Sequence, residues 1–392
     1  MSQPADLEGA LPVATDGDIA VTNLESAREQ SWSRFWRAPE RAGIAEGIVE
    51  QEALTAQFLG DLRAFDRLET LVNQLACIEP QSSRIALIQA QFASMTHRFN
   101  EAKGYLAQAA LRGAPEKSVT PLSLSIDQAC GTDLESLLGI RRQRAAESGR
   151  LEDLVPLGAL LADLGMFEEA DQIYRQALWE YQDVSPFAVA WACFQLGMLW
   201  GEQAHLPQSS RAARWYRLAI DYLPCYVKAR VHLAELCLHE DRLAEAEALL
   251  IPALSANDPE VNWRLADVLN ATGRFDEAAV QLRTARSGFE TLLQKQLLAF
   301  ADHGVEFYSA TGNDPQRALE LARINVANRP TLRAFELAHT AAVTAGESQV
   351  ASDMLAAAAK RWEGTSAFDL SPLAPQCGES TKAIREYSFP GP

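Results

Sequence analysis

The sequence predicts an all-α fold, in which about nine helix-turn-helix units stack into an α-solenoid. Apolar residues recur at intervals of three and four along most of the 392-residue chain, which is the pattern of amphipathic helices. Runs of β-branched residues that alternate with polar ones are missing, so almost no sheet is expected. A common order of apolar and small residues also returns about every 34 residues, an interval that is typical of repeat proteins.

The N-terminal segment is expected to precede the repeats. Residues 1–22 are rich in Pro, Gly, Asp and Ala without apolar periodicity, and they are expected to form a disordered or extended arm. Residues 23–48 are expected to form a capping helix, because Trp32, Phe35 and Trp36 can cover the exposed core of the first repeat. The alternative is that these three aromatic side chains form a docking patch for a partner.

The solenoid is expected over residues 49–363. Its fourth unit is the best defined, with Gly158, Ala170, Tyr174 and Ala177 at the eighth, 20th, 24th and 27th positions. Without bulk at the eighth, 20th and 27th positions, the two helices of a unit can pack closely, ridge into groove. The expected units start at residues 49, 83, 117, 151, 190, 227, 259, 298 and 331.

The C-terminal segment, residues 364–392, contains much Pro, Gly and Ser and is expected to follow the last unit as a tail. Two interpretations are open. The tail could be disordered, or it could lie as an extended strap on the last helices. The strap would bury Phe368, Leu370 and Leu373, and it is favoured because the apolar content is high for a solvated tail.

The spacing of the units resembles that of the tetratricopeptide repeat (TPR) family, which has Leu-Gly at positions 7–8, small residues at 20 and 27, an aromatic residue at 24 and often Pro at 32. The units that start at residues 49, 83 and 117 depart from the pattern because they lack Gly at the eighth position. The resemblance implies a right-handed superhelix whose inner surface, formed by the first helix of each unit, binds a partner peptide or helix. The chain is therefore expected to be a protein-interaction scaffold or adaptor.

The inner-surface positions that the resemblance implies are aromatic and charged in the C-terminal half, whereas they are small or uncharged in the first half. Bulky anchors with directional polar groups resemble a binding hot spot. The alternative is that several of these side chains only contact the neighbouring unit. The candidate partner-binding residues are Trp191, Phe194, Met198, Lys228, His232, Glu235, Trp263, Arg264, Asp267, His303, Glu306, Phe335 and His339.

Two of the expected inner helices contain a His-x-x-Glu sequence, His232 with Glu235 and His303 with Glu306, and residues three apart share a helix face. A second hypothesis is therefore an accessory or catalytic subunit that binds a metal or small ligand through these four residues. The two pairs lie two units apart, roughly 20 Å at about 10 Å per helix, so they can share one ion only if the superhelix curls tightly. No metal or other cofactor is expected.

No phosphate-binding loop, GxSxG or His-Glu-x-x-His sequence occurs, so the chain is not expected to be an enzyme. A net charge of −17 disfavours nucleic acid as a partner. No apolar run of 18 residues predicts a membrane span, and six scattered cysteines without a CxxC pair favour a reduced, cytoplasmic compartment. Lysine supplies only six of the 35 basic residues, which suggests a GC-rich bacterial source. A protein or peptide partner is expected, with a homo-oligomer or a hetero-complex both open.

Overall fold

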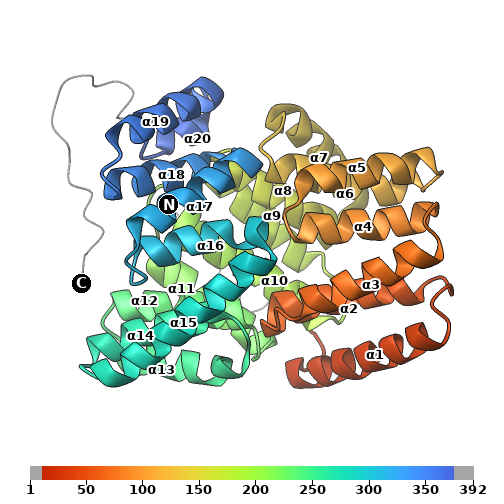
Figure 1. Cartoon of the computed structure of the whole chain (residues 1–392), viewed down its shortest axis with the longest axis horizontal. Helices are drawn as coiled ribbons and strands as arrows, with labels where there is room; N and C mark the ends of the chain where they lie inside the picture. Colours follow the sequence, from red (N-terminus) through yellow and green to blue (C-terminus); the bar gives the residue numbers. More distant parts are fainter. Residues whose placement is uncertain (1–10, 375–392) are drawn as a thin grey trace.

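The computed structural model describes residues 11–374, and none of these residues belongs to a β-strand. Nine antiparallel helix pairs follow one another from α2 to α19, which confirms the predicted all-α repeat array (Figure 1). The α-helices are α1 (Gly17–Arg37), α2 (Ile44–Leu59), α3 (Ala64–Ile78), α4 (Ser83–Met95), α5 (Phe99–Leu111), α6 (Glu116–Ala129), α7 (Leu134–Ser148), α8 (Leu151–Asp163), α9 (Phe167–Trp179), α10 (Pro186–Met198), α11 (Ser209–Tyr222), α12 (Val227–His239), α13 (Leu243–Leu250), α14 (Pro259–Ala271), α15 (Phe275–Lys295), α16 (Leu297–Ser309), α17 (Pro315–Asn328), α18 (Leu332–Thr344), α19 (Ser348–Trp362) and α20 (Ser366–Leu370). No helix in the described part is both long and apolar enough to cross a lipid bilayer.

Most first helices begin within one residue of the expected unit starts, for example α4 at Ser83, α8 at Leu151 and α12 at Val227. Two begin earlier. Helix α2 begins at Ile44, because the side chain of Glu46 accepts a hydrogen bond from the Gly43 N–H (3.0 Å) and so caps the helix there. Helix α10 begins with a proline in its first turn, a position that needs no backbone donor.

The small residues of each repeat allow the paired helices to touch. A Cβ atom added at Gly158 would lie 2.6 Å from the ring of Tyr174, and one added at Gly197 would lie 2.4 Å from the ring of Tyr216. Each aromatic ring therefore rests directly on the backbone of the facing helix. Ala170 and Ala177 are fully buried at the same interface, as close ridge-into-groove packing requires.

The expected N-terminal arm is wrong for residues 17–22, which form the first turns of α1. The side chain of Asp16 caps this helix by accepting hydrogen bonds from two backbone N–H groups, at 3.0 and 3.1 Å. Gly17 lets the helix end approach α11, since a Cβ atom there would lie 2.6 Å from the carbonyl oxygen of Tyr222. The described part of the arm is thus held by contacts with the middle of the array.

The three aromatic residues of α1 have different environments. Phe35 is fully buried in the core of the first pair, and Trp32 donates a hydrogen bond from Nε1 to Glu52 Oε1 (2.7 Å). Trp36 stacks on Trp32 but remains 57% exposed. Two of the three side chains therefore cover the first repeat, and one is open to solvent.

After α19 the chain forms the short helix α20 and continues to Ala374. Phe368 and Leu373 are buried beside Trp362, whereas Leu370 is only half-buried. Helix α20 replaces an extended strap over residues 366–370, and the rest of the tail lies outside the described residues.

The solenoid curls so tightly that its first units contact its last ones (Figure 1). Asp66 of α3 forms an ion pair with Lys295 at the end of α15 (2.7 Å), and Phe65 meets Phe300 of α16 edge to face, with ring centroids 6.0 Å apart. Further along, Arg361 of α19 donates a hydrogen bond to the carbonyl oxygen of Gly131 (2.7 Å). These contacts close the array on itself and decide which inner surfaces remain open.

Candidate functional site

Three of the predicted partner-binding anchors are buried. Trp263 is 2% exposed, Phe335 5% and Phe194 7%. Trp263 packs on Phe289 and Phe307, at centroid distances of 6.2 and 5.5 Å, and donates a hydrogen bond to a threonine hydroxyl of the next unit. Because neighbouring helices cover these rings, the prediction that they are accessible anchors is wrong.

Other candidates lie on the inner helices with partial exposure. Trp191 and Met198 on α10 are half-buried against the main core, and Lys228 on α12 and His339 on α18 are half-buried as well. Asp267 on α14 accepts a hydrogen bond from the same threonine hydroxyl that receives the Trp263 N–H, at 2.5 Å. A partner-binding role for these five residues stays a prediction.

The charged candidates are brought together, and they pair with one another. Arg264 of α14 forms an ion pair with Glu235 of α12 and lies over the ring of Trp263, 3.6 Å from its centroid. His303 Nδ1 lies 3.9 Å from a carboxylate oxygen of Glu260. The tips of these inner side chains are therefore committed to contacts between neighbouring units.

Arg333 of α18 joins this network across the interior. Its guanidinium lies 2.9 Å from Glu306 Oε1 and 3.7 Å from Glu202 Oε2. Glu202 in turn faces His232 of α12. The two predicted His/Glu pairs are thus linked through Arg333 and Glu202, although they do not form one cluster.

Glu202 comes from a π-helical turn, η2 (Leu199–Gln203), that continues α10. The wider turn is closed by a hydrogen bond from the Ala204 N–H to the Leu199 carbonyl oxygen (2.8 Å). Such turns re-aim side chains within a helix and occur frequently at functional sites. Sequence reasoning missed Glu202; the available signal was the extra length of this unit around residues 205–209.

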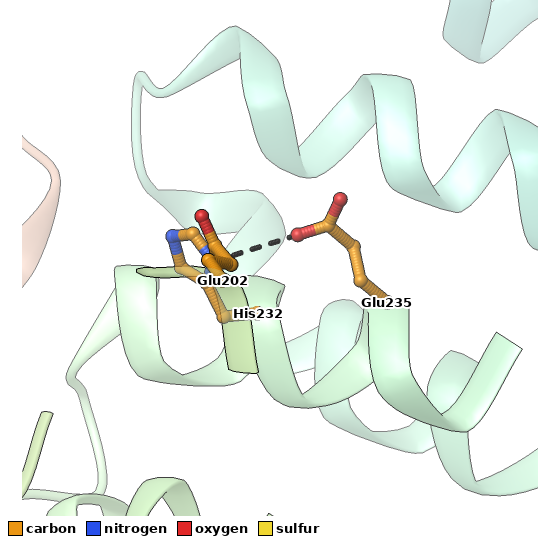
Figure 2. Close-up of side chains that lie close together, drawn as sticks. All are labelled: Glu202, His232 and Glu235. Carbon is orange, nitrogen blue, oxygen red and sulfur yellow. Dashed lines mark ion pairs between the residues drawn. The ribbon is translucent and has the colours of Figure 1, made fainter. Parts of the chain in front are cut away.

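Figure 2 shows how Glu202, His232 and Glu235 converge. His232 Nδ1 lies 2.5 Å from Glu202 Oε1 and 3.5 Å from Glu235 Oε2. The shorter contact is poorly directed, so the buried Nδ1 atom has no well-formed hydrogen bond. The imidazole is fixed by aromatic neighbours, stacked on Tyr216 at 5.7 Å and 24° and meeting Phe194 edge to face at 5.3 Å.

The protonation of these groups follows from burial and from their neighbours. Burial opposes the charge on His232, but the negative charge of Glu202 outweighs it and raises the pKa of the imidazole to about 9. Burial likewise opposes the charge on Glu202, but the neighbouring His232 lowers the pKa of this carboxyl group to about 2. The pKa of Glu235 is raised to about 7, because burial exceeds the effect of Arg264.

A separate groove of about 710 Å³ lies where α3 meets α14 and α15. Its apolar surface comes from Leu62, Phe65, Leu254 and Leu292. Hydroxyl groups and amides from the exposed side of α15 and from the start of α14 complete the wall. The groove exists only because the first helix pair meets the seventh, so the repeat pattern alone gives no sign of it.

The groove also carries more positive than negative charge. Arg63, Arg283 and Lys295 line it together with a single carboxylate, Asp66. Arg63 pairs with Asp61 and Lys295 pairs with Asp66, both at 2.7 Å. Arg283 is exposed and forms no ion pair with any residue that the structure describes. Arg283 is therefore an unpaired cation beside the apolar surface of the groove.

The repeat geometry identifies the fold. In the fourth unit, paired helices of 13 residues place glycine at the eighth position beneath an aromatic ring at the 24th. The fifth unit repeats this contact between Gly197 and Tyr216, with an insertion between the two residues. The chain is a TPR-like α-solenoid. Its departure from an open superhelix lies in the long-range contacts between its first and last units.

No family model matches the TPR-like chain, and no curated protein matches it. Among solved structures, a chain of the APC/C hetero-tetramer Cut9–Hcn1 is similar with 14% identity and a TM-score of 0.44, over 91% of this chain and 67% of that one. Yeast Tom70 has 12% identity and a TM-score of 0.33, over 91% and 96%. The human IFIT1 dimer with PPP-AAAA has 12% identity and a TM-score of 0.35, over 86% and 68%. At identities and scores this low, none of them assigns a partner to this chain.

Proposed function

We propose that the TPR-like array is a non-catalytic scaffold that holds an acidic, extended segment of a partner protein in the groove between α3 and α15. The observation that carries this proposal is the unpaired Arg283 beside an apolar floor. The predicted site on the inner helices is less suitable, because its large aromatic rings are buried and its charges are paired.

The floor of the groove would supply most of the affinity. Leu254 is 38% exposed, and Leu62, Phe65 and Leu292 are half-buried, so apolar side chains of a peptide can be removed from water against them. Pockets that bind ligands are commonly apolar with a few well-placed polar groups. The groove matches this description at a junction between distant parts of the chain.

The exposed side of α15 suits a peptide backbone. Thr284, Ser287 and Thr291 offer hydroxyl groups. Gly288 between them lets α14 pack closely on α15, since a Cβ atom there would lie 2.7 Å from Pro259. Asn257 and Asn262 contribute amides that can donate to and accept from peptide groups. An extended segment that lies along this side of α15 could therefore satisfy its own hydrogen-bonding groups.

Charge selects which segment binds. The chain has a net charge of −17, so an acidic partner is repelled by most of its surface. The groove, with three cations and one carboxylate, is an exception. Complementary charge of this kind guides encounter and suppresses wrong partners more than it adds affinity. Acidic residues next to apolar ones are the expected signature of the bound segment.

We further propose a reduced, cytoplasmic setting. The five cysteines in the described part, Cys77, Cys130, Cys193, Cys225 and Cys237, are all free thiols. Cys193 and Cys237 are buried, and burial raises the pKa of both thiols. Unpaired cysteines are usual in reducing compartments, and the sixth, Cys377, lies outside the described residues.

The test is selection of random 12-residue peptides displayed on phage against the full-length chain. Peptides rich in Asp or Glu with apolar neighbours are expected to be enriched. Arg283→Glu should weaken a selected peptide about tenfold, which corresponds to about 1.4 kcal/mol. Ser287→Trp should block the groove sterically and abolish binding, as measured by fluorescence anisotropy.

Two matched controls separate the groove from general effects. Arg214→Glu makes the same charge change at an exposed position of α11, and Ser352→Trp adds the same bulk to an exposed position of α19. Both should bind the selected peptide like the wild type. Equal loss in Arg214→Glu and Arg283→Glu, or full binding by Ser287→Trp, would contradict the proposed groove.

A further inference from the structure

We propose that Glu202, His232 and Glu235 form a binding site for a divalent transition-metal ion, with Zn²⁺ as the best-matched probe. Within the described part of the chain, these residues come from η2 and α12 and each offers one ligand atom. The three atoms lie within 4.8 Å of one another (Figure 2). A metal at this point would connect two neighbouring units of the array.

The carboxylates divide their oxygen atoms between the centre of the cluster and the surrounding arginines. Glu235 turns Oε2 toward His232 Nδ1 and gives Oε1 to Arg264. Glu202 turns Oε1 toward the same nitrogen and Oε2 toward Arg333. Side chains that ligate metals are typically oriented in this way by outer hydrogen-bonding partners.

The imidazole is also prepared to act as a ligand. His232 Nδ1 is buried and lacks a well-directed hydrogen bond, although two carboxylates lie beside it. The rings of Tyr216 and Phe194 fix the plane of the imidazole. Tyr216 is itself held against Gly197 and Gly201, since Cβ atoms there would lie 2.4 Å from its ring and 3.4 Å from its hydroxyl oxygen.

The charge around the cluster favours a cation. Five carboxylates belong to the network: Glu202, Glu235, Glu260, Asp267 and Glu306. Two guanidinium groups, those of Arg264 and Arg333, oppose them. A metal binds the imidazole of His232 only after its proton is released. The network then carries three excess negative charges, and a divalent cation would offset two of them.

The donor set indicates the class of metal. One imidazole nitrogen with two carboxylate oxygens suits Zn²⁺ and its first-row neighbours, whereas Ca²⁺ and Mg²⁺ prefer all-oxygen sites. Bonds of about 2.0–2.2 Å place tetrahedral ligand atoms roughly 3.3–3.6 Å apart. The 3.5 Å contact already fits, while Glu202 must withdraw slightly from 2.5 Å. Three protein ligands leave one position for water or another ligand.

The test is calorimetric titration of the untagged, full-length, EDTA-treated chain with ZnCl₂ alone at pH 7.5. The wild type should bind one ion. Glu202→Gln and His232→Gln should each weaken binding at least tenfold. His339→Gln, at a half-buried histidine that faces no such carboxylate pair, is the matched control and should bind like the wild type.

The absorption spectrum of the wild type with one equivalent of Co²⁺ gives a second readout that needs no variant. Intense visible bands are expected from a tetrahedral site with nitrogen and oxygen ligands. If the variants lose their helical circular dichroism, this spectrum alone decides whether the wild type has the metal site. The proposal is overturned by a Co²⁺ spectrum like that of the aquated ion, by the absence of saturable Zn²⁺ binding, or by binding that His232→Gln leaves unchanged.

Discussion

The contact of His97 with the later helices of the solenoid can be tested by measuring how the stability of the chain depends on pH. It sits after α4, and its Nδ1–H donates a hydrogen bond to the carbonyl oxygen of Leu298 in α16 (3.2 Å). The backbone carbonyl of His97 also accepts a hydrogen bond from Asn328 (2.9 Å). Both contacts join the first part of the array to the last, so the state of this side chain reports on that junction.

The junction disfavours a charged imidazole. Burial, together with the positive charge of Arg329, lowers the pKa of His97 from 6.5 to about 4. The charge of Asp302 and the hydrogen bond to Leu298 act in the opposite direction and do not compensate. The folded chain therefore keeps His97 neutral at pH values where the unfolded chain protonates it.

The sign and size of the effect follow from this difference. A depressed pKa contributes stability above the unfolded value of 6.5, and this contribution is lost as the pH falls toward 4. Each unit of pKa difference corresponds to about 1.4 kcal/mol, so the full effect of the change from 6.5 to about 4 is about 3.4 kcal/mol. Between pH 7.5 and 5.5, the linkage relation gives a loss of about 1.3 kcal/mol from this one residue.

The perturbation is His97→Asn. His97 has a positive φ of 54°, a conformation that asparagine tolerates well, and the asparagine amide can still donate a hydrogen bond. Urea unfolding is measured at pH 7.5 and 5.5, above the isoelectric pH of about 4.9. Circular dichroism and tryptophan fluorescence must give coincident transitions for the free energies to be compared.

The variant should lose about 1.3 kcal/mol less stability than the wild type over this pH range. Equal losses in the two proteins would refute the reasoning, because they would show that His97 titrates alike in the folded and unfolded chains. The imidazole is identified as the cause if the two proteins have similar unfolding free energies at pH 7.5 and differ only at pH 5.5.

Three further substitutions test the packing. Gly197→Ala places a Cβ atom 2.4 Å from the Tyr216 ring and should lower the unfolding free energy by about 1–3 kcal/mol, seen as a lower melting midpoint. Gly104→Ala, whose Cβ atom would meet nothing within 4 Å, should instead raise the unfolding free energy by about 0.5–1 kcal/mol. Equal destabilisation by the two alanine substitutions would exclude the ring contact as the cause. Trp263→Ala removes a ring that is 2% exposed and should cost about 3–5 kcal/mol, whereas an unchanged midpoint would restore Trp263 as a surface anchor.

The repeats could be predicted because they depend on contacts that are close in sequence. The ring of Tyr174 meets Gly158, and both residues belong to one unit with a recognisable spacing. The same pairing recurs with Gly197 and Tyr216 in the following unit. Helix starts such as Leu151 were therefore readable from the sequence, since the pattern that buries these residues is local.

The inner surface could not be predicted in the same way. Small rotations between successive units add up, and their sum determines whether distant units meet. Trp263 occupies an inner position of its unit, yet the following helices cover it. Glu202 was missed because a π-helical turn, rather than a regular repeat position, aims it at His232. Arg333 connects two charged pairs that the repeat frame places far apart.

The contacts between the first and last units also affect how the chain folds during synthesis. Lys295 is added 229 residues after its partner Asp66. At about 5–20 residues per second, the early units wait roughly 10–50 s for the surface that covers them. Phe65, which later meets Phe300, is exposed to other nascent chains during this interval. A ribosome-bound chain that stops before α15 should therefore depend on chaperones more than an open repeat array of the same length.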